Sequence, residues 1–220
     1  LLKGVPGVRA LIGRYELAVG IIARLDQLDA RVAETEHRIE SDHVLDPDQQ
    51  ERIATELIDL RDATWAVRHD RLRTAREVES LVGRDSTLAA VAGYLAVQQA
   101  LSALDRLEVR GRDSAGLHLF VWNHGLSLSD PVVRRMLSER GTDPLFQNGS
   151  VRVAGDCLGF VYKAAAEIGE LGDNTRALRT AVGADALLRL ALSQPDARLT
   201  VLGHTRWASV GIISEANCHP

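Results

Sequence analysis

A seven-residue repeat of apolar side chains over the first 81 residues restricts the possible folds more than any other feature of this sequence. Such spacing gives a helix one apolar stripe, which is buried only by packing against a second helix. Up to residue 39 the repeat is imperfect only at Arg14 and Thr35. We expect a long helix introduced by Pro6 and Gly7. The repeat consists of Leu11, Ala18, Leu25, Val32 and Ile39, with Ile21 and Leu28 at the complementary positions.

A second repeat with the same spacing follows a polar break at residues 42–48. Asp46 before Pro47 is typical of a helix start, because proline fits the first helical position. This helix should end near Gly83. Its repeat is Ile53, Leu60, Val67, Thr74 and Leu81, supported by Leu57 and Val78 and weakened at Thr64 and Arg71. Two long helices joined by a short polar turn form an antiparallel hairpin. Two roles remain open for it, an interaction or oligomerisation arm and a structural insertion.

The composition limits the classes of partner and cofactor. Hydrophobic residues make up 45% and charged residues 25%, as in ordinary globular domains. A net charge of −4 gives no reason to expect nucleic acid, and no apolar run is long enough for a membrane span. Two cysteines, Cys157 and Cys218, are too few for a disulfide framework, so we expect a reducing cytoplasm. No Walker loop or metal-spaced Cys/His set appears, and no cofactor or metal is expected.

The remainder of the chain predicts an α+β fold. A helix capped by Asp85 or Ser86 should run to about residue 107, and strands are predicted at residues 116–122, 151–153 and 198–205. Further helices are predicted at residues 131–139, 162–171 and 175–192. Asn148 and Gly149 are typical of a turn before the second of these strands.

The end of the chain places an arginine and a tryptophan at the end of the last strand. Arg206 and Trp207 are followed by the small residues Ala208, Ser209 and Gly211. A guanidinium group beside such a turn suits a planar anion, because it binds a carboxylate through two parallel hydrogen bonds. For an isolated Arg-Trp pair, the favoured explanation would be a surface ion pair and a core tryptophan.

Three segments carry a resemblance to a known family. Residues 203–209, GHTRWAS, resemble the GHTRWAT motif of the class II glutamine amidotransferases of the glucosamine-6-phosphate synthase type. Residues 107–116, LEVRGRDSAG, are similar to that family's LEYRGYDSAG, and residues 217–220, NCHP, to its NAHP. The segments occur in the family's order, and together they are more specific than any one alone. The resemblance covers about residues 86–126 and 199–220.

The resemblance implies a fold and an activity. It implies a partial N-terminal-nucleophile hydrolase domain, an αββα sandwich, over residues 85–220, with a further insertion at about residues 127–197. Residues 1–84 would be an inserted helical hairpin. A protein of this family hydrolyses glutamine to glutamate and ammonia, and uses the ammonia to make glucosamine 6-phosphate from fructose 6-phosphate. The implied partners are glutamine and, through a domain outside this chain, the sugar phosphate; we also expect a homo-oligomer.

The same resemblance assigns roles to individual residues. Arg206 would bind the α-carboxylate of glutamine, with Trp207, Ser209 and His219 completing the glutamine-binding set. Ser209 keeps the hydroxyl of the family's threonine, whereas Val210 replaces its usual histidine.

The other motif is expected to form the scaffold near the nucleophile. Its matching residues are Arg110, Gly111 and Asp113, and Gly111 is expected to permit a close backbone approach. Arg112 replaces the family's usual tyrosine and is expected at the surface.

No catalytic residue of the family is expected in this chain. The family's nucleophile is a cysteine at the mature N-terminus, whose own α-amino group can act as the base. Leu1 stands at the start here, and Cys157 and Cys218 are expected to be ordinary buried thiols. Because the chain starts without Met and stops at a motif, we expect a fragment that is inactive by itself.

One alternative function stays open. A catalytically decayed amidotransferase-like scaffold could keep the fold while the helical arm serves as a protein-interaction module. Val210 and the two insertions motivate this alternative, whereas retention of Arg206, Gly111 and Asp113 argues against it.

Overall fold

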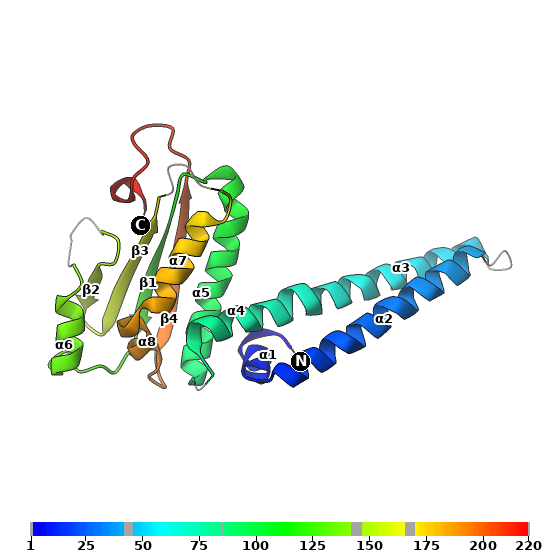
Figure 1. The fold of residues 1–220 in the computed structure, drawn as a ribbon, viewed down its shortest axis with the longest axis horizontal. Helices are drawn as coiled ribbons and strands as arrows, with labels where there is room; N and C mark the ends of the chain where they lie inside the picture. Colours follow the sequence, from blue (N-terminus) through cyan, green and yellow to red (C-terminus); the bar gives the residue numbers. More distant parts are fainter. Residues whose placement is uncertain (1, 42–45, 85, 142–146, 166–169, 220) are drawn as a thin grey trace. The chain divides into compact units, whose positions relative to one another are not determined.

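Figure 1 shows the computed structural model, which describes residues 2–41, 46–84, 86–141, 147–165 and 170–219. The chain divides between Glu79 and Ser80 into two units, each described here by itself. Unit 1 is helical, and unit 2 combines helices with a four-stranded antiparallel sheet. The predicted α+β class is therefore confirmed, whereas the sandwich fold and the insertion of residues 1–84 remain predictions.

Unit 1 contains the predicted hairpin, but its first helix is broken. Helix α1 (Gly4–Leu11) ends before α2 (Tyr15–Ser41) begins, so the expected uninterrupted helix is wrong. Gly13, in the break, has a φ of +71°, a backbone conformation that favours glycine. Arg14, where the apolar repeat is imperfect, lies in the same break.

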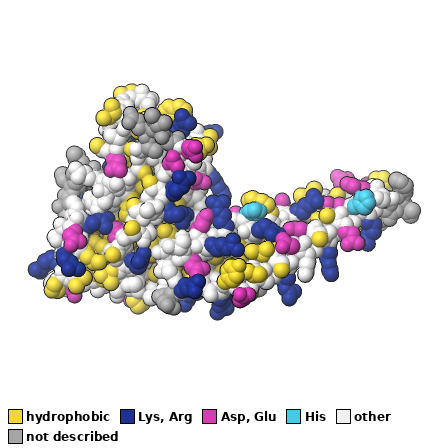
Figure 2. All heavy atoms as spheres, in the orientation of Figure 1, with side chains coloured by type: hydrophobic (Ala, Val, Ile, Leu, Met, Phe, Trp, Pro, Cys, Tyr) yellow, Lys and Arg dark blue, Asp and Glu magenta, His cyan; other side chains and the backbone are white. Residues whose placement is uncertain are grey.

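Helices α2 and α3 (Pro47–Trp65) run antiparallel. The Arg68 guanidinium binds the carboxylates of Asp26 and Asp29 at 2.9 Å each, and Arg61 pairs with Glu36 nearer the helix ends. Figure 2 shows side chains of both charges along the outer surface of this hairpin. The antiparallel hairpin is confirmed, while residues 42–45 of its predicted turn lie outside the described residues.

A π-helical segment, η1 (Ala66–Leu72), accounts for the weak part of the second repeat. A π turn holds one more residue than an α turn and therefore shifts the apolar stripe along the helix. As a result, Leu72 rather than Arg71 is buried, at 3% exposure. Leu72 packs with Leu11, Leu25 and Ala75 in the core of unit 1. The chain continues into α4 (Arg73–Val82).

The sheet of unit 2 has the strand order β2-β3-β1-β4. The strands are β1 (Ser114–Trp122), β2 (Val151–Ala154), β3 (Cys157–Ala164) and β4 (Arg198–Arg206). Helices α5 (Leu88–Leu107) and α7 (Asp173–Ala184) pack on one face of the sheet, as Figure 1 shows, and α8 (Ala186–Leu192) packs beside α5. Helix α6 (Pro131–Ser138) begins at Pro131, as predicted, and Asp130 caps it.

The two faces of this sheet differ in character. The face toward the helices holds the buried core; its members include Leu117, Leu119, Val121, Leu158 and Phe160. The opposite face includes exposed Trp122 and Leu202 beside the half-buried Phe120. Within the described ranges, every helix is either too short or too polar to cross a lipid bilayer.

Three local predictions in unit 2 are wrong, and one of them is the single helix expected at residues 175–192, which Asp185 divides into α7 and α8. The helix expected at residues 162–171 does not start where predicted, because β3 continues to Ala164 and pairs with β1; residues 166–169 of that prediction lie outside the described residues. This tertiary pairing overrides the helix preference of an alanine-rich segment. Thr87, and not Ser86, caps α5 by accepting a hydrogen bond from the Ala90 amide at 3.1 Å, while the other predicted cap, Asp85, lies outside the described residues. The turn predicted at Asn148 and Gly149 is confirmed, because the Ser150 amide donates to the Gln147 carbonyl at 3.0 Å just before β2, and the β2–β3 hairpin itself turns after Ala154.

Candidate functional site

The two sequence motifs lie side by side at one end of β1 and β4. Ser114 pairs with Arg206 at the end of the antiparallel ladder, and Arg112 forms a bridge to Arg206 just beyond it. The amide of Asp113 donates to the Arg206 carbonyl at 3.1 Å. The fold therefore joins residues 107–116 to residues 203–209.

A carboxylate fixes the turn that follows β4. The Asp113 Oδ2 atom accepts a hydrogen bond from the Ala208 amide at 2.6 Å, across a separation of 95 residues. Asp113 thus binds the backbone on both sides of Trp207, through the Arg206 carbonyl and the Ala208 amide. A short charge-assisted hydrogen bond of this kind is stronger than a neutral one.

Gly111 allows the two segments to approach each other. A Cβ atom built at Gly111 would lie 2.8 Å from Thr205 Oγ1, 3.0 Å from Thr205 Cβ and 3.2 Å from the Arg206 amide nitrogen. The first distance is shorter than real Cβ contacts. Only glycine fits here without a shift of β4. By contrast, the side chains of Arg110 and Arg112 are exposed.

The guanidinium group of Arg206 is only partly paired. Its Nη2 atom donates to the Val210 carbonyl at 2.7 Å, which folds the loop back toward the strand. Its Nη1 atom is buried and has no hydrogen-bond partner among the residues that the structure describes. A buried, unpaired donor on a cation is costly, and an anion could relieve that cost by accepting from it.

The loop after β4 is apolar and exposed. Trp207, Val210 and Ile212 are 63%, 82% and 75% exposed, and Figure 2 shows hydrophobic side chains at the top of unit 2, where Figure 1 places this loop. Trp207 is therefore not the core residue that the alternative reading expected. Ser209 is also exposed, and Gly211 takes a left-handed φ of +86°.

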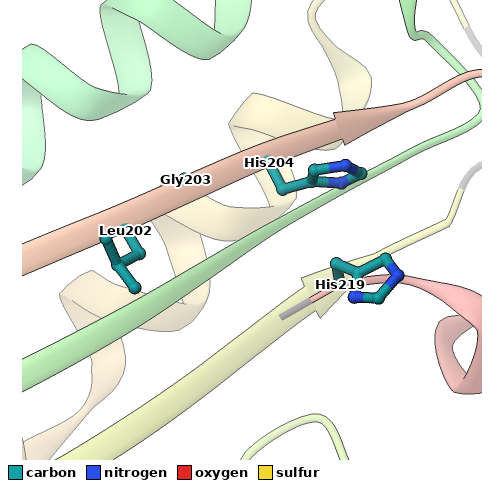
Figure 3. Close-up of a pocket in the computed structure, with 4 residues that line it drawn as sticks. All are labelled: Leu202, Gly203, His204 and His219. Carbon is teal, nitrogen blue, oxygen red and sulfur yellow. The ribbon is translucent and has the colours of Figure 1, made fainter.

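A shallow cavity of about 370 Å³ lies beside this loop, lined by Leu202, Gly203, His204 and His219. Figure 3 shows the first three along β4 and His219 on the returning C-terminal segment. The two histidine rings meet edge to face, with centroids 5.2 Å apart. Partial burial lowers the pKa of His204, and the neighbouring His219 and Arg206 lower it further. His204 lies on the exposed part of β4 and lines this cavity.

Neither cysteine has the environment of a nucleophile. Burial raises the pKa of both thiols, and both residues are buried as predicted. The Cys218 thiol donates to the Ala115 carbonyl at 3.1 Å, so it lies against the end of β1. A nucleophilic thiolate needs a lowered pKa and access to substrate.

The other histidines fall outside this site. His37 and His69 are exposed in unit 1, and His43 lies outside the described residues. His118 and His124 are buried, and burial is the main cause of their lowered pKa values. In the part of the chain that the structure describes, no group of three acidic, histidine or cysteine side chains could hold a metal ion.

Sequence reasoning missed the contribution of two buried residues outside the assigned set. Both are buried polar side chains: Glu108, within the first motif, accepts from the Gly172 amide, and Asn174 donates to the Arg112 carbonyl of that motif. Asn174 follows Gly172 and Asp173, which the sequence shows only as a break between helices. No periodicity or motif marks Asn174, since its partner lies 62 positions earlier in the chain.

Comparison of the chain with protein-family models, with curated proteins and with solved structures finds no match.

Proposed function

We propose that this chain carries the glutamine-binding part of a glutamine-dependent amidotransferase. The protein would hydrolyse glutamine to glutamate and ammonia and pass the ammonia to a sugar phosphate. With fructose 6-phosphate as the acceptor, the product would be glucosamine 6-phosphate. The acceptor is proposed from the resemblance of the motifs alone.

The buried, unpaired Nη1 atom of Arg206 carries this proposal. A carboxylate that accepted from Nη1 would satisfy the donor and pair with the guanidinium charge. The α-carboxylate of glutamine is such a group. The backbone around Arg206 is already fixed by Asp113, so little reorganisation would accompany binding.

The neighbouring groups are compatible with the rest of an amino acid. His204 and His219 border an open cavity on the outer face of the sheet, and Leu202 adds an apolar wall. Ser209 offers an exposed hydroxyl, and Trp207 an exposed indole ring. Val210, in place of a histidine, contributes only its carbonyl, which holds Arg206.

The alternative function is a decayed scaffold whose helical arm binds another protein. The observation that favours it is the state of the thiols, because Cys157 and Cys218 are buried and have raised pKa values. Neither can supply the nucleophile. The amidotransferase proposal therefore requires a nucleophile from outside these 220 residues.

Glutaminase activity of the full-length protein tests the proposal. Glutamate release should rise when fructose 6-phosphate is added, and it should fall strongly in Arg206→Ala. Arg206→Lys is the matched control, because it keeps the charge but loses the paired donors. It should therefore raise the KM for glutamine. Folded full-length protein that releases no glutamate would rule out the amidotransferase and favour the scaffold.

A further inference from the structure

The first turn of helix α7 holds the segment that carries the first motif. The Gly172 amide donates to Glu108 Oε2 at 2.6 Å, and the Asn174 side-chain amide donates to the Arg112 carbonyl at 2.7 Å. In the same turn, the Thr175 hydroxyl donates to Asp105 at 3.2 Å, on helix α5 and outside the motif segment. Helix α7 therefore binds the chain on both sides of Gly111.

These hydrogen bonds involve buried side chains, so they contribute more to holding the motif segment in place than surface hydrogen bonds would. Glu108 and Asn174 are only 1% and 2% exposed. The Glu108 carboxylate also lies at the N-terminus of a 12-residue helix, where the helix dipole favours an anion. Gly172 has a left-handed φ of +93°, which a residue with a side chain would rarely adopt.

A short path joins Asn174 to the loop after β4. Asn174 fixes the Arg112 carbonyl, which belongs to the same peptide group as the Asp113 amide. That amide donates to the Arg206 carbonyl, and the Asp113 carboxylate accepts from the Ala208 amide. The orientation of this peptide group thus affects both contacts that Asp113 makes, the one with the Arg206 carbonyl and the one with the Ala208 amide.

We propose that Asn174 is a positioning residue for the glutamine site, acting through the 112–113 peptide group on Asp113 and Arg206. This inference rests on the proposed function. Asn174 belongs to none of the three motifs, and its side chain lies on the helix face of the sheet rather than in the site. It would improve binding of an α-amino carboxylate by holding the arginine loop in its binding geometry.

Two measurements on the 220-residue chain test this role. The first is hydrogen exchange of the Ala208 amide by NMR, and the second is the Kd for L-glutamine from an NMR titration. In Asn174→Ala we expect about five- to tenfold faster exchange and a Kd weaker by a similar factor, as for the loss of one buried hydrogen bond. Asn174→Asp keeps the size of the side chain but cannot donate to Arg112, and it should show the same changes.

Thr175→Val is the matched control. Thr175 lies in the same helical turn and is 8% exposed, but its hydroxyl binds Asp105 rather than the motif backbone. We expect its Kd and its Ala208 exchange to stay within about twofold of the original chain. A thermal melt would show that each variant is folded.

The outcomes separate this inference from the proposed function. Equal losses in Asn174→Ala and Thr175→Val would show a merely structural role and overturn the inference. Unchanged exchange and Kd in folded Asn174→Asp would also overturn it. If the original chain does not bind glutamine, the proposed function fails. Ala208 exchange would then still decide whether Asn174 positions the loop.

Discussion

Replacing Gly111 by alanine tests the close contact between the two motif segments. The new methyl group would lie 2.8 Å from Thr205 Oγ1 and 3.0 Å from Thr205 Cβ, inside ordinary contact distances. The backbone of Gly111 is extended, with φ at −161°, so the expected effect is steric and not conformational. Overpacking of this kind costs about 1–3 kcal/mol. With a urea dependence of about 2 kcal/mol per M, the unfolding midpoint should fall by about 1 M.

Urea unfolding followed by tryptophan fluorescence gives the measurement. Trp65 belongs to unit 1, so a Trp65→Phe background leaves Trp122 and Trp207 to report on unit 2. Gly141→Ala is the matched control, because nothing lies within 4 Å of its new methyl group.

Adding Thr205→Ala to Gly111→Ala removes the nearer contact and should restore part of the lost stability. If Gly111→Ala is as stable as Gly141→Ala, the two motifs do not pack as described.

Three further predictions concern stability. Thr87→Ala should lower the free energy of unfolding of unit 2 by about 1 kcal/mol, because it removes the cap of α5, and Ser86→Ala should lower it less. Gly20→Ala should raise the melting temperature of unit 1 by stabilising α2 by about 0.5–1 kcal/mol, because its methyl group meets nothing within 4 Å. The free energy of unfolding of unit 2 should fall as the pH drops below about 6.5. Three histidines have pKa values that are lowered in the folded state, so they take up protons on unfolding. Each can change the free energy of unfolding by at most about 1.4 kcal/mol per pH unit. These residues are His118, His124 and His204.

Each of these predictions has a contrary result. An equal loss of unfolding free energy in Thr87→Ala and Ser86→Ala would contradict the assignment of Thr87 as the cap of α5. A lower melting temperature in Gly20→Ala would mean that α2 is not helical there. The sign of the pH effect follows because a histidine whose pKa is lower in the folded state binds more protons when unfolded. A urea midpoint that stayed constant from pH 7 to pH 5 would contradict it.

The hairpin could be predicted from the sequence because the apolar repeat that specifies it is a local pattern. Apolar residues every seven positions define one buried stripe, and polar residues at Arg14 and Arg71 coincide with real irregularities. The break at Gly13 and the π-helical segment that follows Trp65 were not predicted. Both depend on how Leu11 and Leu72 meet in one cluster, which is a tertiary contact.

The strands with apolar runs were also predictable, whereas the end of β3 was not. Tyr162 and the alanine-rich residues after it favour a helix locally, but pairing with β1 continues to Ala164. A single sequence does not show such a pairing. The cap at Thr87 was missed because Ser86 is an equally good capping residue by type.

At the candidate site, the motifs identified Arg206, Gly111 and Asp113, and the structure brings these residues together. The hydrogen bond from the Ala208 amide to the Asp113 carboxylate was not predictable, because it joins residues 95 positions apart. The role of Asn174 was not predictable either, because no sequence pattern around it indicates its hydrogen bond to the distant Arg112 carbonyl.

Binding of L-glutamine to the 220-residue chain is the most direct test of the central claim. Isothermal titration should show saturable binding to the original chain, and Arg206→Ala should weaken it at least tenfold, as expected for the loss of a charge-assisted pair. Gly141→Ala should bind like the original chain. Folded protein that does not bind L-glutamine, or an Arg206→Ala variant that binds it equally well, would contradict the assignment of this site.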